Sequence, residues 1–117
     1  MTLIDRYVAA WNETDAEARA KAVAELWTED ATYTDPLAAV TGHESIAAVI
    51  AGAQDMFPGC VFTAGEVFDA HHDIARFTWH LAPSGAAEPL VVGFDVVELA
   101  EDGRIRKVLG FLDKVPA

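Results

Sequence analysis

The sequence has little of three things that would point to particular classes of protein. It holds one cysteine, Cys60, so no disulfide can form within the chain, and a reducing compartment is expected. It has 8 Lys and Arg residues against 19 Asp and Glu, a net charge of −11, which disfavours nucleic-acid and anionic-membrane binding. No apolar run approaches the roughly 18 residues of a membrane-spanning helix, and the N-terminus lacks a signal-peptide pattern. We therefore expect a cytoplasmic protein with no nucleic-acid or membrane partner.

Motifs for phosphate binding, nucleophilic catalysis and metal binding are also missing. There is no Gly-rich phosphate loop and no Ser-His-Asp pattern with a nucleophile elbow. Among the four histidines, His71 and His72 are adjacent and would face opposite sides of a strand, while His43 lies in a helix-capping segment. We expect no metal and no cofactor. His80 shares a polar strand face with Arg76, which we expect to meet solvent or a partner subunit, the alternative being a binding site.

What is present fits one globular domain spanning residues 1–117. Hydrophobic residues make up 52% of the chain and charged residues 23%, close to the average of globular domains, so disorder is not expected. A chain of this length can bury one hydrophobic core without disulfides or metals.

The first half of the chain has the periodicity of helices. Apolar residues recur at helical spacing after Thr2, which is a suitable N-cap, and again after a break at residues 12–15. The predicted elements are helices at 3–11 and 16–27, a short strand at 31–34, and a third helix that follows the capping-box spacing Thr41-Gly42-His43-Glu44 and ends at Pro58-Gly59.

The second half of the chain has the two-residue period of strands. Strands are predicted at 61–68, 74–81, 90–99 and 105–112, with a tight hairpin at Asp102-Gly103 between the last two. Three helices followed by a four-stranded antiparallel meander predict an α+β fold. The helices would pack on one face of a curved sheet and leave a cavity between the layers.

Three polar residues stand where the pattern predicts apolar surroundings. Tyr7 lies on the buried stripe of the first helix, Asp95 lies on an apolar strand face, and Asp35 ends a strand before a proline. A carboxylate base with two neutral donors suits proton transfer next to a carbonyl, because the base takes the proton and the donors hold the enolate oxygen. The alternatives are an ordinary core tyrosine, a turn-forming Asp35 and an Asp95 on a solvated strand face.

Large aromatic side chains are the candidates for lining such a cavity. They are Trp11, Trp27, Phe57, Trp79 and Phe111. The tryptophans are interpreted as core and pocket residues, and Cys60 as an inert buried thiol.

Several segments together resemble the nuclear transport factor 2-like (NTF2-like) superfamily, in its SnoaL-like branch. The similar segments are residues 6–12, 26–36, 41–46, 71–79, 93–97 and 102–105. The resemblance covers nearly the whole chain. It implies a cone-shaped α+β fold with three N-terminal helices on a curved, mostly antiparallel sheet, a deep pocket, and a homodimer formed through the sheet.

Within this superfamily, steroid Δ5-3-ketoisomerase has a catalytic pattern that can be placed on the sequence. Its helix-one tyrosine corresponds to Tyr7, its general base to Asp35, and its protonated oxyanion-hole aspartate to Asp95. SnoaL polyketide cyclases use one pocket aspartate as acid and base, for which Asp95 is again the candidate. A third resemblance, to limonene epoxide hydrolase, would join Asp95 with Arg76 and Asp113.

These patterns favour a cofactor-independent acid/base enzyme acting on a hydrophobic carbonyl compound. The alternatives are a non-catalytic binder of a small hydrophobic ligand, and a scaffolding domain whose pocket is filled by Trp and Phe side chains. The feature that discriminates these hypotheses is whether Tyr7, Asp35 and Asp95 converge on one open cavity.

One sheet face is left without a covering layer in the predicted fold. The pattern places Phe94, Val96, Val92 and Val108 on this face, and an apolar patch of that kind normally marks an interface. We therefore expect a homodimer with two-fold symmetry.

Overall fold

The first two helices begin at side-chain caps. The computed structural model describes residues 2–116. Thr2 is the N-cap of α1 (Leu3–Asn12), as predicted. The Thr2 hydroxyl accepts the Asp5 amide at 3.2 Å, and the Asp5 carboxylate accepts the Thr2 amide at 3.1 Å. This reciprocal pair fixes the direction in which α1 leaves the N-terminus. The side chain of Asp15 caps α2 (Ala16–Leu26) by accepting the Ala18 amide at 2.9 Å.

The capping box predicted at Thr41 is wrong. Thr41 belongs to strand β2 (Ala39–Thr41), where it pairs with Thr32 of β1 (Trp27–Thr34). Gly42 is the N-cap of α3 (His43–Met56), with a φ of +94° and no side-chain hydrogen bond. A glycine suits this position because other residues rarely adopt that φ.

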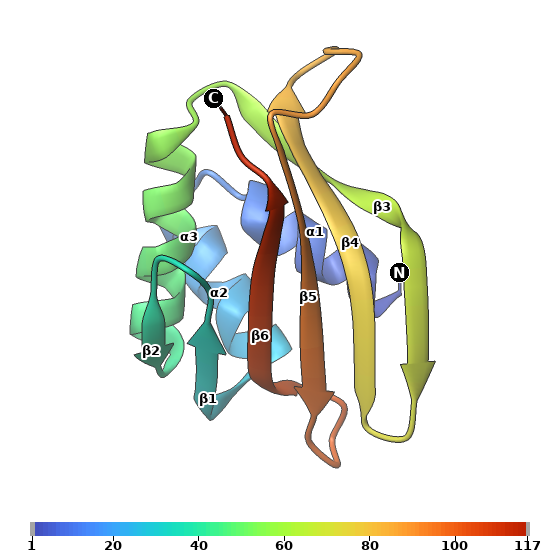
Figure 1. Cartoon of the computed structure of the whole chain (residues 1–117). Coiled ribbons are helices and arrows are strands. Elements are labelled where there is room, and N and C mark those ends of the chain that lie inside the picture. Colours follow the sequence, from blue (N-terminus) through green and yellow to red (C-terminus); the bar gives the residue numbers. More distant parts are fainter. Residues whose placement is uncertain (1, 117) are drawn as a thin grey trace.

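The six strands form one sheet in the order β2-β1-β6-β5-β4-β3. The last four are β3 (Cys60–His71), β4 (Ile74–Pro83), β5 (Val91–Leu99) and β6 (Ile105–Lys114), and they form the predicted antiparallel meander. β1 is parallel to β6. All three helices lie on one side of the curved sheet, so the predicted α+β fold is confirmed (Figure 1).

Alternate residues of β5 face the two sides of the sheet. Val91, Gly93, Asp95 and Val97 are buried under the helices, and the residues between them are half-buried on the outer side. Val108 differs from the prediction, since it is fully buried beneath the helices. Glu98 pairs with Lys107, but the next residue, Leu99, pairs with Ile105, so Arg106 is an extra residue in β6. This extra residue breaks the alternation of β6 and turns Val108 toward the helices.

Two amide side chains fix the end of α1 against the neighbouring elements. The Asn12 amide donates to the Phe62 carbonyl at 2.8 Å and accepts the Phe62 amide at 2.7 Å. The Gln54 amide of α3 donates to the carbonyls of Trp11 and Glu13 at 2.9 and 2.8 Å. These bonds satisfy carbonyls at the helix end and hold the aromatic rings of α1 and β3 in fixed positions.

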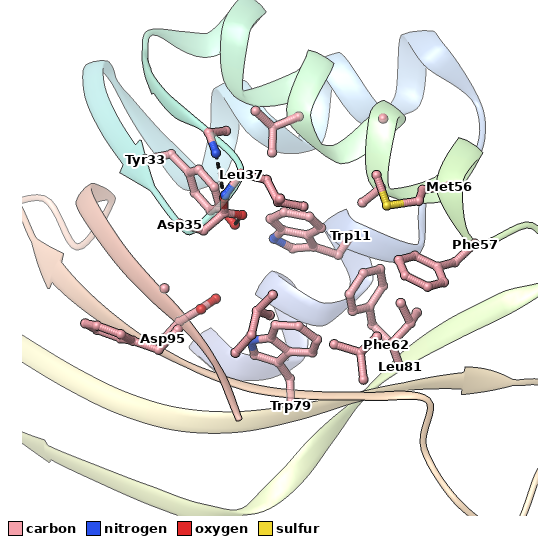
Figure 2. A pocket seen from close by; sticks show the side chains of 18 of the residues that line it. Trp11, Tyr33, Asp35, Leu37, Met56, Phe57, Phe62, Trp79, Leu81 and Asp95 are labelled. Carbon is pink, nitrogen blue, oxygen red and sulfur yellow. Dashed lines mark hydrogen bonds between the residues drawn. The ribbon is translucent and has the colours of Figure 1, made fainter. Parts of the chain in front are cut away.

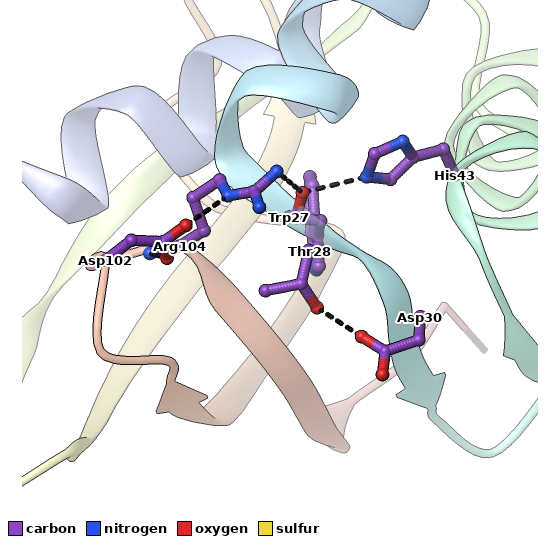
Figure 3. Close-up of polar contacts among 6 residues, drawn as sticks. All are labelled: Trp27, Thr28, Asp30, His43, Asp102 and Arg104. Atoms are coloured by element: carbon purple, nitrogen blue, oxygen red, sulfur yellow. Dashed lines mark hydrogen bonds and ion pairs between the residues drawn. The ribbon is translucent and has the colours of Figure 1, made fainter.

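The carbonyl of Trp27 joins three segments at the other end of the sheet. It accepts a hydrogen bond from His43 Nε2 at 2.8 Å and one from Arg104 at 3.4 Å, and Arg104 is itself held by Asp102 at 2.8 Å (Figure 3). The start of α3 and the β5–β6 hairpin are thereby tied to the start of β1. This contact gives His43 a structural role.

Within residues 2–116, no helix is long and apolar enough to cross a membrane.

Candidate functional site

A cavity of about 450 Å³ lies between the helices and the sheet. Most of its wall is apolar (Figure 2). Besides two tryptophans, the lining residues with polar side chains are Tyr7, Tyr33, Asp35 and Asp95. An open cavity with a few convergent polar groups is typical of a small-molecule site.

Tyr7 and Asp95 form a buried pair at the polar end of the cavity. Each is 3% exposed, and the Tyr7 hydroxyl donates to Asp95 Oδ2 at 2.6 Å. Burial raises the pKa of Asp95 to about 6, although the hydrogen bond from Tyr7 acts in the opposite direction. Burial and the nearby Asp95 charge raise the pKa of Tyr7 well above its usual value, so its hydroxyl remains a donor.

Tyr33 and Asp35 form a second pair, contributed by β1 and the turn after it. The Tyr33 hydroxyl donates to Asp35 Oδ2 at 2.7 Å, and the amides of Leu37 and Ala38 donate to Oδ1 at 2.8 Å each. Asp35 therefore forms the turn before Pro36 and also lines the cavity.

Gly110 allows the two carboxyl groups to converge. It pairs with Asp95 across the β5–β6 ladder, and a Cβ atom at this position would lie 2.8 Å from Asp95 Oδ1 and 3.3 Å from Asp35 Cβ. The two acidic side chains thus lie over the same backbone position. Tyr7, Asp35 and Asp95 come from α1, the β1–β2 turn and β5, and all three line one cavity.

Most of the aromatic residues proposed as pocket lining do line the cavity. Trp11, Phe57, Trp79 and Phe111 are among its wall residues, although the Phe111 ring stacks on the outward-facing Phe94, with 5.0 Å between ring centroids. Trp27 differs from the prediction. It is fully buried and packs behind the Tyr7 ring, 5.5 Å away, outside the set of wall residues.

Sequence reasoning missed several wall residues, and Tyr33 and Gly110 are the two that contact the acidic side chains. Tyr33 stands two positions before Asp35, a spacing that places both on one side of a strand and that could have identified it. Gly110 gave no such signal, because its position opposite Asp95 depends on the irregular register of β6.

The epoxide hydrolase-like arrangement is not formed. Arg76 is exposed and pairs with Val96, on the opposite side of the sheet from Asp95, and Asp113 is also exposed. Neither residue lines the cavity. His80 lies on the same outer side as Arg76. In the part of the chain that the structure describes, no cluster of three or more His, Cys, Asp or Glu residues is placed to hold a metal ion.

The buried Asp95 carboxyl predicts a pH dependence of stability. Its folded pKa of about 6 lies above its ordinary value of 3.8, so the free energy of unfolding should fall as pH rises between these values. Relative to Asp95→Asn, the wild type should lose on the order of 3 kcal/mol across this range. Urea unfolding of both proteins from pH 4 to 8 measures the difference. A large loss of stability in Asp95→Asn at pH 7 would instead mean that the carboxylate is ionised and tightly paired.

Comparisons with known proteins agree with this architecture. A family model described as "SnoaL-like domain" matches residues 4–108. A protein of the SnoaL-like family from Agrobacterium tumefaciens, described as a "putative isomerase", has 40% identity and a TM-score of 0.89. That match covers 95% of this chain and 94% of the other. A search among curated proteins finds no match.

More distant solved structures share the fold. A "putative polyketide cyclase" from Sinorhizobium meliloti has 19% identity over 92% of each chain, with a TM-score of 0.71. An NTF2-like protein of unknown function from Exiguobacterium has 18% identity, with coverage of 96% of this chain and 98% of its own and a TM-score of 0.73. The family model and the 40% identical relative show that this chain belongs to the SnoaL-like family, and its fold is NTF2-like.

Proposed function

We propose that this protein is a cofactor-independent acid/base enzyme that transfers a proton next to the carbonyl group of a hydrophobic compound. The observation that carries the proposal is the pair of carboxyl groups over Gly110, at the polar end of an apolar cavity. Their surroundings differ. Asp35 accepts three hydrogen bonds, whereas Asp95 is almost fully buried with a raised pKa. Two carboxyl groups held in different environments are suited to act as base and acid.

The proposed reaction is an isomerisation that begins at Asp35. Its carboxylate accepts the proton from the carbon next to the carbonyl, which leaves an enolate. The Tyr7 hydroxyl and protonated Asp95 donate hydrogen bonds to the enolate oxygen. Asp35 then returns the proton to another carbon of the conjugated system, so the product is an isomer and no external reductant or oxidant is needed. The test is a panel of β,γ-unsaturated ketones and polyketide-like compounds, with a naphthol titrated in parallel as an enolate analogue.

The pH dependence of the reaction follows from the role of Asp95. Because the donor must be protonated, kcat/KM should fall as pH rises past about 6, the pKa of this group in the free protein. Asp95→Asn retains a neutral donor and should remove this limb of the profile. A wild-type kcat/KM that rises through pH 6 would show that Asp95 acts in its ionised form.

A second candidate function uses Asp95 alone as acid and base, as in a polyketide cyclase-like reaction. It is favoured by the engagement of both Asp35 oxygens in hydrogen bonds and by the near-neutral pKa of Asp95. The two candidates differ in their dependence on Asp35. Activity that survives Asp35→Asn but not Asp95→Asn supports the cyclase-like reaction, and ligand binding without turnover supports a non-catalytic binder.

We further propose that the protein forms a homodimer through the outer side of the sheet. Phe94 and Val96 are half-buried there, and Leu109 and Phe111 beside them are 41% and 50% exposed. A second copy related by two-fold symmetry would cover this apolar surface. Sedimentation at tens of micromolar should give the mass of two chains. A single-chain mass at that concentration contradicts the proposal.

A further inference from the structure

Three indole N–H groups are buried without a hydrogen-bond partner in residues 2–116. They belong to Trp11, Trp27 and Trp79. Against the larger effect of burial, the Trp79 N–H lowers the pKa of Asp95 and the Trp11 N–H lowers the pKa of Tyr7, so these two indoles face the Tyr7–Asp95 pair without forming a hydrogen bond of normal geometry to it. Buried donors are nearly always paired, since an unpaired one has lost its hydrogen bonds to water without replacement. Trp11 and Trp79 line the cavity, whereas Trp27 does not. Two of the three unpaired donors therefore lie where a bound molecule can reach them.

The two cavity indoles have a common orientation. In Figure 2, each ring nitrogen lies at the end of its indole that faces the acidic side chains, Trp11 toward Asp35 and Trp79 toward Asp95. The Phe62 ring packs against both indoles, with centroids 5.4 Å from Trp11 and 5.6 Å from Trp79. The Trp79 ring also rests on Gly93, where a Cβ atom would overlap it. These contacts hold both N–H groups toward the polar end of the cavity.

The charges around the cavity restrict what can accept these hydrogen bonds. No Lys, Arg or His is among the described residues that form its wall, and the wall carries two carboxyl groups, Asp35 and Asp95. A carboxylate or phosphate ligand would be repelled, because nothing at the polar end compensates a second negative charge. Indole N–H groups are neutral donors and bind an uncharged oxygen without that difficulty.

We infer that Trp11 and Trp79 are ligand-binding donors that select a neutral carbonyl compound over both its hydrocarbon and its carboxylate analogue. The inference rests on the proposed function only in that the cavity takes an apolar carbonyl compound. The indoles orient the carbonyl oxygen at the acidic end of the cavity, while the aromatic rings bind the apolar part. A site with buried donors discriminates against a ligand that leaves them unpaired.

The indole N–H signals in a ¹H–¹⁵N correlation NMR spectrum test whether these groups bind the ligand, without changing the protein. 2-Tetralone should move the Trp11 and Trp79 N–H protons downfield and leave Trp27 unmoved. Tetralin, which has the same rings without the oxygen, should cause no such downfield shift. The corresponding carboxylate, 1,2,3,4-tetrahydro-2-naphthoate, should not bind. The three signals are assigned with the Trp→Phe variants.

Binding constants provide the second measurement. Trp79→Phe and Trp11→Phe should each reduce the affinity for 2-tetralone relative to tetralin by about 3- to 10-fold, the usual net value of one hydrogen bond. Trp27→Phe is the matched control and should leave the ratio unchanged, because its unpaired N–H lies outside the cavity wall. If a variant does not fold, the wild-type spectra decide.

The outcomes separate this inference from the proposed function. If 2-tetralone binds but the Trp11 and Trp79 signals do not shift, or the affinity ratio is unchanged in both variants, the inference is overturned and the proposed function stands. Tight binding of the carboxylate also overturns it. If neither 2-tetralone nor tetralin binds to the wild type, both the inference and the proposed function fail.

Discussion

Asp35→Asn should lower kcat by 10²- to 10⁴-fold on any β,γ-unsaturated ketone that the wild type isomerises, which is the usual range for a general base. The amide keeps the size of the side chain, and its one oxygen can still accept the amides of Leu37 and Ala38. Its NH₂ group replaces the oxygen that accepts the Tyr33 hydroxyl, and the amide cannot take up the substrate proton. The measurement is the isomerisation rate at saturating ketone.

Asp30→Asn is the matched control for this variant. Asp30 is an exposed carboxylate on β1, the strand that leads to Asp35, and it accepts a hydrogen bond from Thr28 at 3.1 Å, away from the cavity wall. Its substitution should leave kcat within about twofold, as expected for a surface change. Equal losses in both variants would indicate a general effect of negative charge and would contradict the role of Asp35 as base.

Gly110→Ala should lower kcat/KM by about 10- to 100-fold, since displacement of a catalytic group by a fraction of an ångström is costly. The added methyl group would lie 2.8 Å from Asp95 Oδ1 and 3.3 Å from Asp35 Cβ, so the two carboxyl groups must separate. The expected loss thus arises from the site geometry. It is measured together with the affinity for 2-naphthol, which should also fall.

Gly52→Ala tests whether any added methyl group in the cavity has this effect. Gly52 lines the same cavity from α3, and a Cβ atom there would meet no atom within 4 Å. Alanine is also preferred over glycine in a helix by up to about 1 kcal/mol, so this variant should be slightly more stable and nearly as active. If Gly52→Ala loses as much activity as Gly110→Ala, the convergence over Gly110 is not what matters.

Local patterns in the sequence predicted the elements that have strong local signals. The N-cap at Thr2, the hairpin at Asp102-Gly103 and the meander all appear in the structure. The position of Asp95 on a buried strand face was also predictable, because alternation places it beside Gly93 and Val97. Each of these features depends on residues close to one another in the chain.

Features that depend on distant pairing were not predictable from local pattern. Trp27 continues the apolar helical spacing of α2, but in the structure it is the first residue of β1. Its pairing partner there is Ile105 of the parallel strand β6, some 80 residues later in the chain, and this distant pairing overrides the local helical pattern. Thr41 has the sequence of a cap, yet its backbone pairs with β1. The extra residue in β6 placed Val108 inside and Gly110 opposite Asp95, and no turn motif marks that residue.

The candidate site combines both kinds of information. The spacing of Tyr7 and Asp95 on apolar faces indicated that each side chain points inward, but their 2.6 Å hydrogen bond joins residues 88 positions apart. The resemblance to SnoaL-like proteins provided the expectation that they meet in one pocket, which local patterns could not provide. The unpaired indoles of Trp11 and Trp79 could be recognised only from the structure, since burial and orientation decide them.

The most direct test of proton abstraction is deuterium exchange at the C1 position of 2-tetralone in D₂O, followed by NMR with catalytic amounts of the protein. This measurement needs no knowledge of the natural substrate, because it detects removal of a proton next to a carbonyl. The wild type should accelerate exchange at C1 well above the buffer rate, and Asp35→Asn should abolish the acceleration while still binding 2-tetralone. Exchange that is equally fast with the wild type, with Asp35→Asn and in buffer alone, at concentrations where 2-tetralone is bound, would contradict the acid/base function.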